Sequence, residues 1–219
     1  TNNALETSFE RLSTGKRINS AVDDAAGLSI ANQLESKANG LNQAIRNIND
    51  GISVVSIAEG ALSEVTTVLQ RLRDLAVQGA SDTLGTNERT AIESETDNLI
   101  ASITSAIGAA EFGSVGTIDG TFASANGKLL QVGADSGDTL SIAIEAMTLA
   151  TLDVEDADIA VDTAANAATA LTNIDAAIAE VNTERGKLGA LGSQLESSVR
   201  NLANVAENSA AARSRTIDT

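Results

Sequence analysis

The feature that most constrains the fold is an apolar repeat of seven residues between positions 41 and 76. A second apolar set is interleaved with it at steps of three or four, and no proline interrupts either set. Such spacing is typical of a long helix whose apolar stripe lies against another long helix. The pattern predicts a helix from about Asp24 to Gln78, on the order of 80 Å long, and hence a rod. The stripe consists of Leu41, Ile48, Val55, Leu62, Leu69 and Ala76.

A matching stripe lies near the other end of the chain and predicts a third long helix from Asp162 to about Thr216. A shorter helix from Glu88 to Ile107 is expected to fold back on the first after a turn rich in glycine and serine. Since an exposed apolar stripe needs a partner, we expect the two long stripes to form a helical seam. The second stripe consists of Ile174, Val181, Leu188, Leu195 and Leu202.

Between these helices the pattern changes to alternating apolar and polar residues on either side of Gly133–Asp138. Alternation around a turn rich in glycine and aspartate predicts a β-hairpin. The predicted fold class is therefore mainly α, a long antiparallel rod or bundle of three long helices with a small β-hairpin insertion. We expect three segments: two parts of a helical core at 1–112 and 151–219, and a central hairpin segment at 113–150.

The composition excludes several classes of function. A formal net charge of −16 disfavours nucleic acid, whose phosphates need a basic face, and anionic membrane surfaces. No uninterrupted apolar run approaches the length that spans a membrane, so no membrane partner is expected. Histidine and cysteine are both absent, which excludes imidazole catalysis, zinc sites of the HExxH type and thiolate chemistry. We expect no enzyme activity, no cofactor and no metal.

Two acidic clusters allow more than one interpretation. Ser20 and Asp23 fit a capping box at the start of the first long helix, and paired carboxylates there could alternatively hold a metal ion. The run from Asp153 to Asp162 contains five acidic residues. It is interpreted as a solvated outer surface, with a calcium loop as the alternative, although its spacing matches no EF-hand. A glycosidase-type carboxylate pair is disfavoured because nothing predicts a pocket around these residues.

Several long motifs at both ends of the chain carry a family resemblance. They lie at Ser8–Gly27, Asn47–Ser53, Leu69–Gln78 and Leu202–Arg215. With them, the chain resembles a bacterial flagellin, and it looks like a core fragment that lacks both extreme termini. The resemblance implies a secreted structural subunit, which is exported through the flagellum and polymerises into the extracellular motility filament.

The resemblance also implies partners. These are other flagellin subunits, an export chaperone, and the cap and junction proteins of the filament. The alternative functions are a flagellin-like hook–filament junction protein, and a cell-surface homologue that acts as a receptor or adhesin. Both share the terminal helices, so the helical motifs do not separate them from a filament subunit.

A candidate contact patch consists of Arg71, Leu75 and Glu95. Residues 71 and 75 are four apart and off the seam, so they are neighbours on one stripe. From spacing alone, we favour Leu75 packing under the Glu88–Ile107 helix with Arg71 solvated. The resemblance favours another interpretation, because all three residues match positions that contact the vertebrate toll-like flagellin receptor. Neighbouring subunits cover the same positions in the filament.

Overall fold

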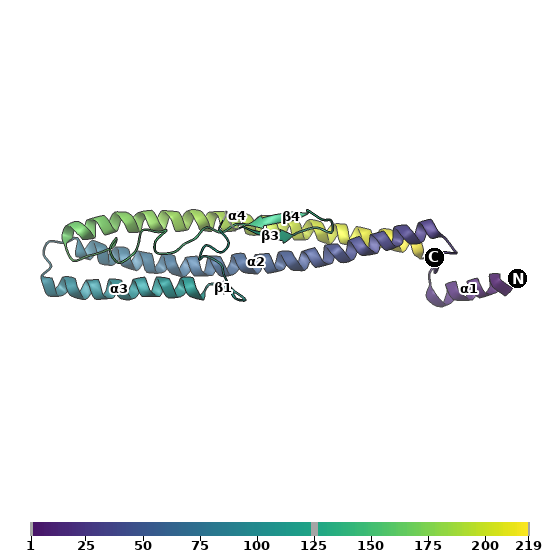
Figure 1. Ribbon diagram of the computed structural model, residues 1–219, viewed down its shortest axis with the longest axis horizontal. Coiled ribbons are helices and arrows are strands. Elements are labelled where there is room, and N and C mark those ends of the chain that lie inside the picture. Colours follow the sequence, from purple (N-terminus) through teal and green to yellow (C-terminus); the bar gives the residue numbers. More distant parts are fainter. Residues whose placement is uncertain (1, 124–126, 219) are drawn as a thin grey trace. The chain divides into compact units, whose positions relative to one another are not determined.

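The structure is a computed structural model that describes residues 2–123 and 127–218 (Figure 1). Within these residues the helices are α1 (Asn2–Thr14), α2 (Ala25–Gly79), α3 (Thr86–Ala109) and α4 (Ala164–Ile217). The strands are β1 (Glu111–Phe112), β2 (Val115–Gly116), β3 (Lys128–Gln131) and β4 (Thr139–Ile142). The mainly α class, with three long helices and a small β-hairpin, is confirmed. The ends of all three long helices lie within about two residues of those expected from apolar periodicity.

The apolar stripes of α2 and α4 are the best-buried parts of the chain. Nine of the ten predicted seam residues expose 5% of their surface or less, and Leu202 is half-buried. Burial of a leucine or isoleucine side chain contributes about 1.5–3 kcal/mol relative to exposure. We therefore expect the seam to contribute strongly to stability. The nine buried residues are Leu41, Ile48, Val55, Leu62, Leu69, Ile174, Val181, Leu188 and Leu195.

The chain divides into two compact units, each assembled from separate stretches of sequence. Unit 1 comprises Thr1–Asp50, Leu130–Leu140 and Leu195–Thr219, and unit 2 comprises Gly51–Leu129 and Ser141–Gln194. Both α2 and α4 contribute to both units. The contiguous segmentation at 1–112, 113–150 and 151–219 stays a prediction.

In unit 2, α3 and the adjoining parts of α2 and α4 lie side by side (Figure 1). A Cβ added at Gly192 on α4 would lie 3.9 Å from the Val55 side chain, and Arg73 Nε lies 2.7 Å from Asp175 Oδ1. Since residue numbers rise along α2 while those of their partners fall along α4, the two helices run antiparallel.

The connection from α2 to α3 is held by Arg89. Its guanidinium donates hydrogen bonds to the carbonyl oxygens of Gly79 at 2.5 Å and Ser81 at 2.8 Å. Carbonyl groups at the end of a helix have no partner within the helix, so Arg89 closes the C-terminus of α2. Gly79 is closely packed there, because an added Cβ would lie 3.1 Å from Val161 and 3.3 Å from Ala167.

In unit 1, the turn between β3 and β4 lies against α2. The amide of Asn47 donates to the carbonyl of Gln131 at 3.2 Å, and a Cβ added at Gly40 would lie 3.0 Å from the Ala134 side chain. Elsewhere in unit 1, Arg213 Nη2 of α4 lies 3.2 Å from Glu35 Oε2 of α2. A small apolar cluster of Ile18, Leu28, Ala31 and Ile217 joins the start of α2 to the end of α4.

Candidate assembly surfaces

Arg71 and Glu95 form an ion pair on the surface of unit 2. Arg71 Nη2 lies 2.6 Å and Nε lies 3.0 Å from Glu95 Oε1, and the two side chains are 54% and 44% exposed. An exposed pair of this kind contributes about 0–1 kcal/mol to stability. The pair therefore contributes little to the stability of the fold, and it places a positive and a negative charge side by side on the surface.

Leu75 is not part of that surface. It lies one turn beyond Arg71 and is only 3% exposed. The burial of Leu75 beneath α3 is the arrangement that spacing alone favoured, and contact of this patch with a partner stays a prediction. The family resemblance had favoured exposure of Leu75.

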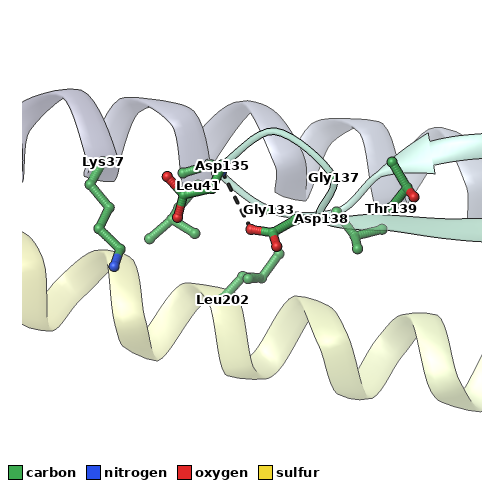
Figure 2. Close-up of a pocket in the computed structure, with 10 residues that line it drawn as sticks. Lys37, Leu41, Gly133, Asp135, Gly137, Asp138, Thr139 and Leu202 are labelled. Carbon is green, nitrogen blue, oxygen red and sulfur yellow. Dashed lines mark hydrogen bonds between the residues drawn. The ribbon is translucent and has the colours of Figure 1, made fainter.

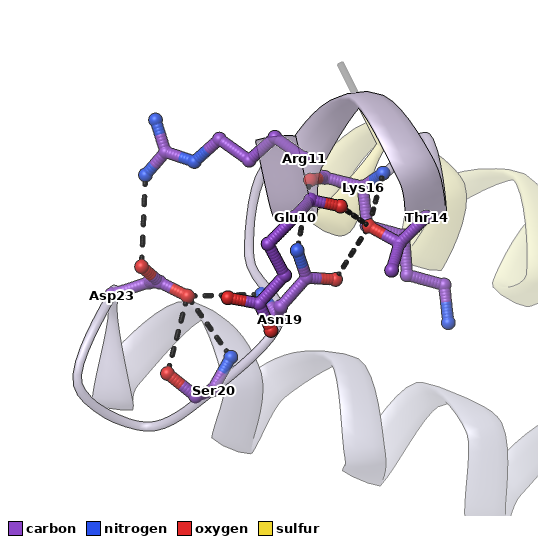
Figure 3. A network of polar contacts seen from close by, with 7 residues as sticks. All are labelled: Glu10, Arg11, Thr14, Lys16, Asn19, Ser20 and Asp23. Atoms are coloured by element: carbon purple, nitrogen blue, oxygen red, sulfur yellow. Dashed lines mark hydrogen bonds and ion pairs between the residues drawn. The ribbon is translucent and has the colours of Figure 1, made fainter. Parts of the chain in front are cut away.

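A polar network ties the end of α1 to the turn that precedes α2 (Figure 3). Asp23 Oδ2 accepts hydrogen bonds from the backbone N–H groups of Ser20 at 3.0 Å and Asn19 at 3.1 Å, and from the Ser20 hydroxyl at 3.2 Å. Arg11 Nη2 in α1 lies 3.7 Å from Asp23 Oδ1. The Ser20 N–H bond, the Asn19 N–H bond, the Ser20 hydroxyl and the Arg11 charge hold the pKa of Asp23 below its ordinary value.

Ser20 and Asp23 thus close a turn ahead of the helix, and the expectation that they cap α2 is corrected. The cap is Asp24, whose Oδ1 accepts from the N–H groups of Ala26 at 3.1 Å and Gly27 at 2.9 Å. A carboxylate at this position satisfies free amides of the first turn and stabilises the positive end of the helix dipole. Adjacent aspartates both fit the sequence pattern, and only the path of the chain decides between them.

A shallow cavity of about 470 Å³ lies beside the tip of the β3–β4 hairpin in unit 1. Figure 2 shows Lys37 and Leu41 of α2, Leu202 of α4 and residues of the turn around it. The Asp138 carboxylate accepts a hydrogen bond from the Asp135 N–H at 3.4 Å. That carboxylate is therefore engaged by the turn itself.

The acidic segment after β4 separates its charges from its apolar residues. Among the described residues, Leu152, Val154, Ile159 and Val161 are buried, while most of the carboxylates between them are exposed. No group of three or more potential metal ligands converges in the parts of the chain that the structure describes. Burial and the neighbouring Asp156 carboxyl raise the pKa of Asp97 on α3.

A buried carboxylate that the sequence reasoning missed lies on the seam face of α4. Glu184 is 1% exposed, and its Oε1 accepts from the backbone N–H of Glu145 at 3.0 Å. Its Oε2 lies 2.8 Å from Lys187 Nζ, and this hydrogen bond and charge raise the pKa of Lys187. Glu184 therefore fastens the segment after β4 to α4. The feature of the sequence that could have indicated the burial of Glu184 is its position beside the apolar stripe of α4.

The expectation of no membrane partner stays a prediction. By length and composition alone, α2 could cross a membrane, since an 18-residue window has a mean hydropathy of 1.4 with 44% of it buried. A search for uninterrupted apolar runs misses such a window, because the window tolerates polar residues. The observation is weak evidence for a membrane span, since core helices of soluble proteins pass the same test.

The fold is that of a mainly helical protein, with an apolar seam buried inside and with ion pairs and shallow grooves on its surface. Two family models match the chain: the bacterial flagellin N-terminal helical region over residues 1–123, and the C-terminal helical region over residues 171–219. The chain belongs to the bacterial flagellin family. It is a structural subunit of the flagellar filament, which lies outside the cell.

Relatives and solved structures agree with this assignment. A flagellin of Halalkalibacterium halodurans is 37% identical over 99% of this chain and 78% of its own length. Polar flagellin F of Vibrio parahaemolyticus is 45% identical over 65% of this chain, and the match spans only 37% of that relative. The crystal structure of Bacillus cereus flagellin is 26% identical, with a TM-score of 0.62 over 72% of this chain and 88% of its own.

A second solved structure shares the fold. It is a putative flagellar hook-associated protein from Vibrio parahaemolyticus, with a TM-score of 0.72 at 21% identity. The match covers 87% of this chain and 99% of that one. At this identity the likeness concerns the fold alone.

Proposed function

We propose that this chain builds the filament by packing the outer faces of its helices against neighbouring copies, while the buried seam keeps each copy rigid. The supporting observation is the contrast between the two sides of the helices. The stripes of α2 and α4 are almost fully buried within the chain. The outer faces carry exposed charges and open grooves, which another copy can cover.

The proposal extends to the route and the partners of the protein. The chain is exported, joins the filament outside the cell, and contacts an export chaperone and the cap, hook-associated and junction proteins. Its role is structural rather than catalytic. The family assignment supports these partners, and the absence of histidine and cysteine from the sequence removes the commonest catalytic nucleophile and base pairs.

A receptor contact is a further part of the proposal. The Arg71–Glu95 pair presents a charged, half-exposed surface to a host toll-like flagellin receptor, and Leu75 supports it from beneath. A reporter assay with soluble protein tests this. Arg71→Ala and Glu95→Ala should each reduce signalling, and equal signalling by the parent and the double variant would contradict it.

Electron microscopy of the full-length protein after salt-induced assembly tests the main proposal. Salt is needed because a net charge of −16 repels copies of the chain from one another at low ionic strength. We expect long filaments of uniform diameter. Amorphous aggregates, or a protein that stays monomeric at every salt concentration, would refute the proposal.

The second candidate function is a hook–filament junction protein, because such proteins share the terminal helical motifs that the sequence carries. A cell-surface homologue that acts as a receptor or adhesin is the remaining alternative. Immunogold labelling of whole cells separates the three. Label along the whole filament supports the subunit, label at the filament base supports the junction protein, and label on the cell body supports the surface homologue.

A further inference from the structure

Several glycines inside the long helices have no close neighbour within the chain. A Cβ added at Gly60 of α2, at Gly108 of α3, or at Gly186 or Gly189 of α4 would meet nothing within 4 Å, and all four positions are exposed. Of these, Gly60 and Gly189 have a charged residue four positions away on the same helix. A glycine in a helix interior costs roughly 1 kcal/mol relative to alanine. Gly79, in contrast, has close neighbours within the chain. The open glycines therefore permit a close approach from outside the chain.

Gly60 lies in a groove on the surface of unit 2. The groove has a volume of about 340 Å³, and it is lined by α2 together with the end of α3. Most of its lining is apolar and small, including Ala61, Ala106 and Ala109, with Glu64 as its one charged residue. A groove of this kind fits the backbone of another helix better than a large side chain.

The charges beside the two glycines are complementary. Glu64 lies one turn after Gly60, and Arg185 lies one turn before Gly189. Within residues 2–123 and 127–218, neither the exposed Glu64 nor the half-buried Arg185 has a side-chain hydrogen bond or an ion pair. By comparison, Arg71, Arg73 and Arg213 pair with carboxylates, whereas Arg215, like Arg185, has no carboxylate partner among the described residues.

We propose that the groove at Gly60 receives the Gly189 face of α4 from a second copy of the chain, with Glu64 of one copy facing Arg185 of the other. This inference rests on the proposed function. Because α2 and α4 run antiparallel in unit 2, α2 of one copy also runs antiparallel to α4 of a second copy in the same orientation. When Gly60 then lies opposite Gly189, one step of four residues along each helix places Glu64 opposite Arg185.

The contact is heterologous, because it joins different faces of two copies. Each copy that joins presents a free Gly60 groove or a free Gly189 face to the next one. A contact of this type continues without closing unless the rotation between copies completes a ring. It therefore suits a filament.

The first experiment enlarges the glycines in the full-length protein. Gly60→Leu and Gly189→Leu should keep or raise the melting temperature of the monomer, because leucine favours helix and its Cβ meets nothing within 4 Å. They should also raise the critical concentration for assembly by about tenfold, because the side chain blocks helix approach. Thr183→Leu is the matched control on another face of α4 and should assemble like the parent.

The second experiment exchanges the charges. Glu64→Arg and Arg185→Glu should each raise the critical concentration by about tenfold, and the combined variant should recover most of the loss. Glu59→Arg is the control on α2, since residue 59 is off the Gly60–Glu64 stripe. Circular dichroism of each monomer checks folding, and Arg185→Gln replaces Arg185→Glu if the latter melts early.

The outcomes separate the two proposals. A parent that forms no filament refutes the proposed function and this contact with it. A parent that assembles while the leucine and charge variants do so at the same concentration overturns the contact alone. The proposed contact is also overturned if the combined charge variant assembles no better than the more impaired single variant. It is likewise overturned if a control assembles as poorly as the test variants.

Discussion

Replacing Leu62 by alanine tests whether the seam carries the stability of unit 2. Leu62 is fully buried on α2, in the middle of the stripe that faces α4. Leucine-to-alanine changes at such sites cost about 3–5 kcal/mol, from lost burial and from the cavity that remains. For a chain of this length, each kcal/mol lowers the melting temperature by about 2–4 °C, which gives a decrease on the order of 10 °C.

Thermal and urea unfolding, followed by helical circular dichroism, measure the effect. The matched control is Leu129→Ala on β3, because Leu129 is 71% exposed and the chemical change is the same. The control should shift stability by less than about 0.5 kcal/mol. Leu62→Asp should be more harmful than Leu62→Ala, since it buries an unpaired charge. If Leu62→Ala and Leu129→Ala melt within a degree or two of the parent, the seam does not carry the stability.

Three further changes test local features. The pKa of Asp23 is lowered in the folded state, so its stabilising contribution is present at neutral pH and is lost below about pH 4; acid titration should show a weaker pH dependence for Asp23→Asn. Arg89→Ala leaves helix-end carbonyls unpaired and should cost about 1–3 kcal/mol in urea unfolding, whereas an unchanged midpoint would contradict its capping role. The pKa of Asp97 is raised, so protonation stabilises the fold at low pH and this contribution is lost as pH rises through the folded-state value. Asp97→Asn should therefore melt higher than the parent at neutral pH, and the gap should shrink in acid.

The helices were predictable because their signal is local and repeated. An apolar residue every three or four positions fixes both the helix and the face that it buries, and the absence of proline lets the pattern run. The β3–β4 hairpin was predictable for the same reason, from alternation around a glycine-rich turn. The β1–β2 hairpin was not, because its strands have two residues each and show no periodicity.

The spacing of residues along the sequence could not predict side-chain contacts between distant parts of the chain. Arg89 reaches the end of a preceding helix, and Glu184 receives an N–H from a coil segment about forty residues earlier. Such contacts depend on which surfaces meet, and helical periodicity gives only the face on which a residue lies. For Leu75, spacing was the better guide. It indicated the burial that the structure shows, whereas the family resemblance indicated exposure.

The outer faces of a filament subunit pose a different problem, because their partners belong to another copy. In a protein that acts alone, we expect a glycine within a helix to have a close neighbour in the same chain. We likewise expect an arginine to have a hydrogen-bond acceptor or a carboxylate there. Gly40 and Gly79 have close neighbours, and Arg73 and Arg89 have acceptors. Among the described residues, Gly60, Gly108, Gly186 and Gly189 have no close neighbour, and Arg185 and Arg215 have no acceptor. Since such positions weaken the isolated chain without benefit to it, they are the places where contact between copies is best sought.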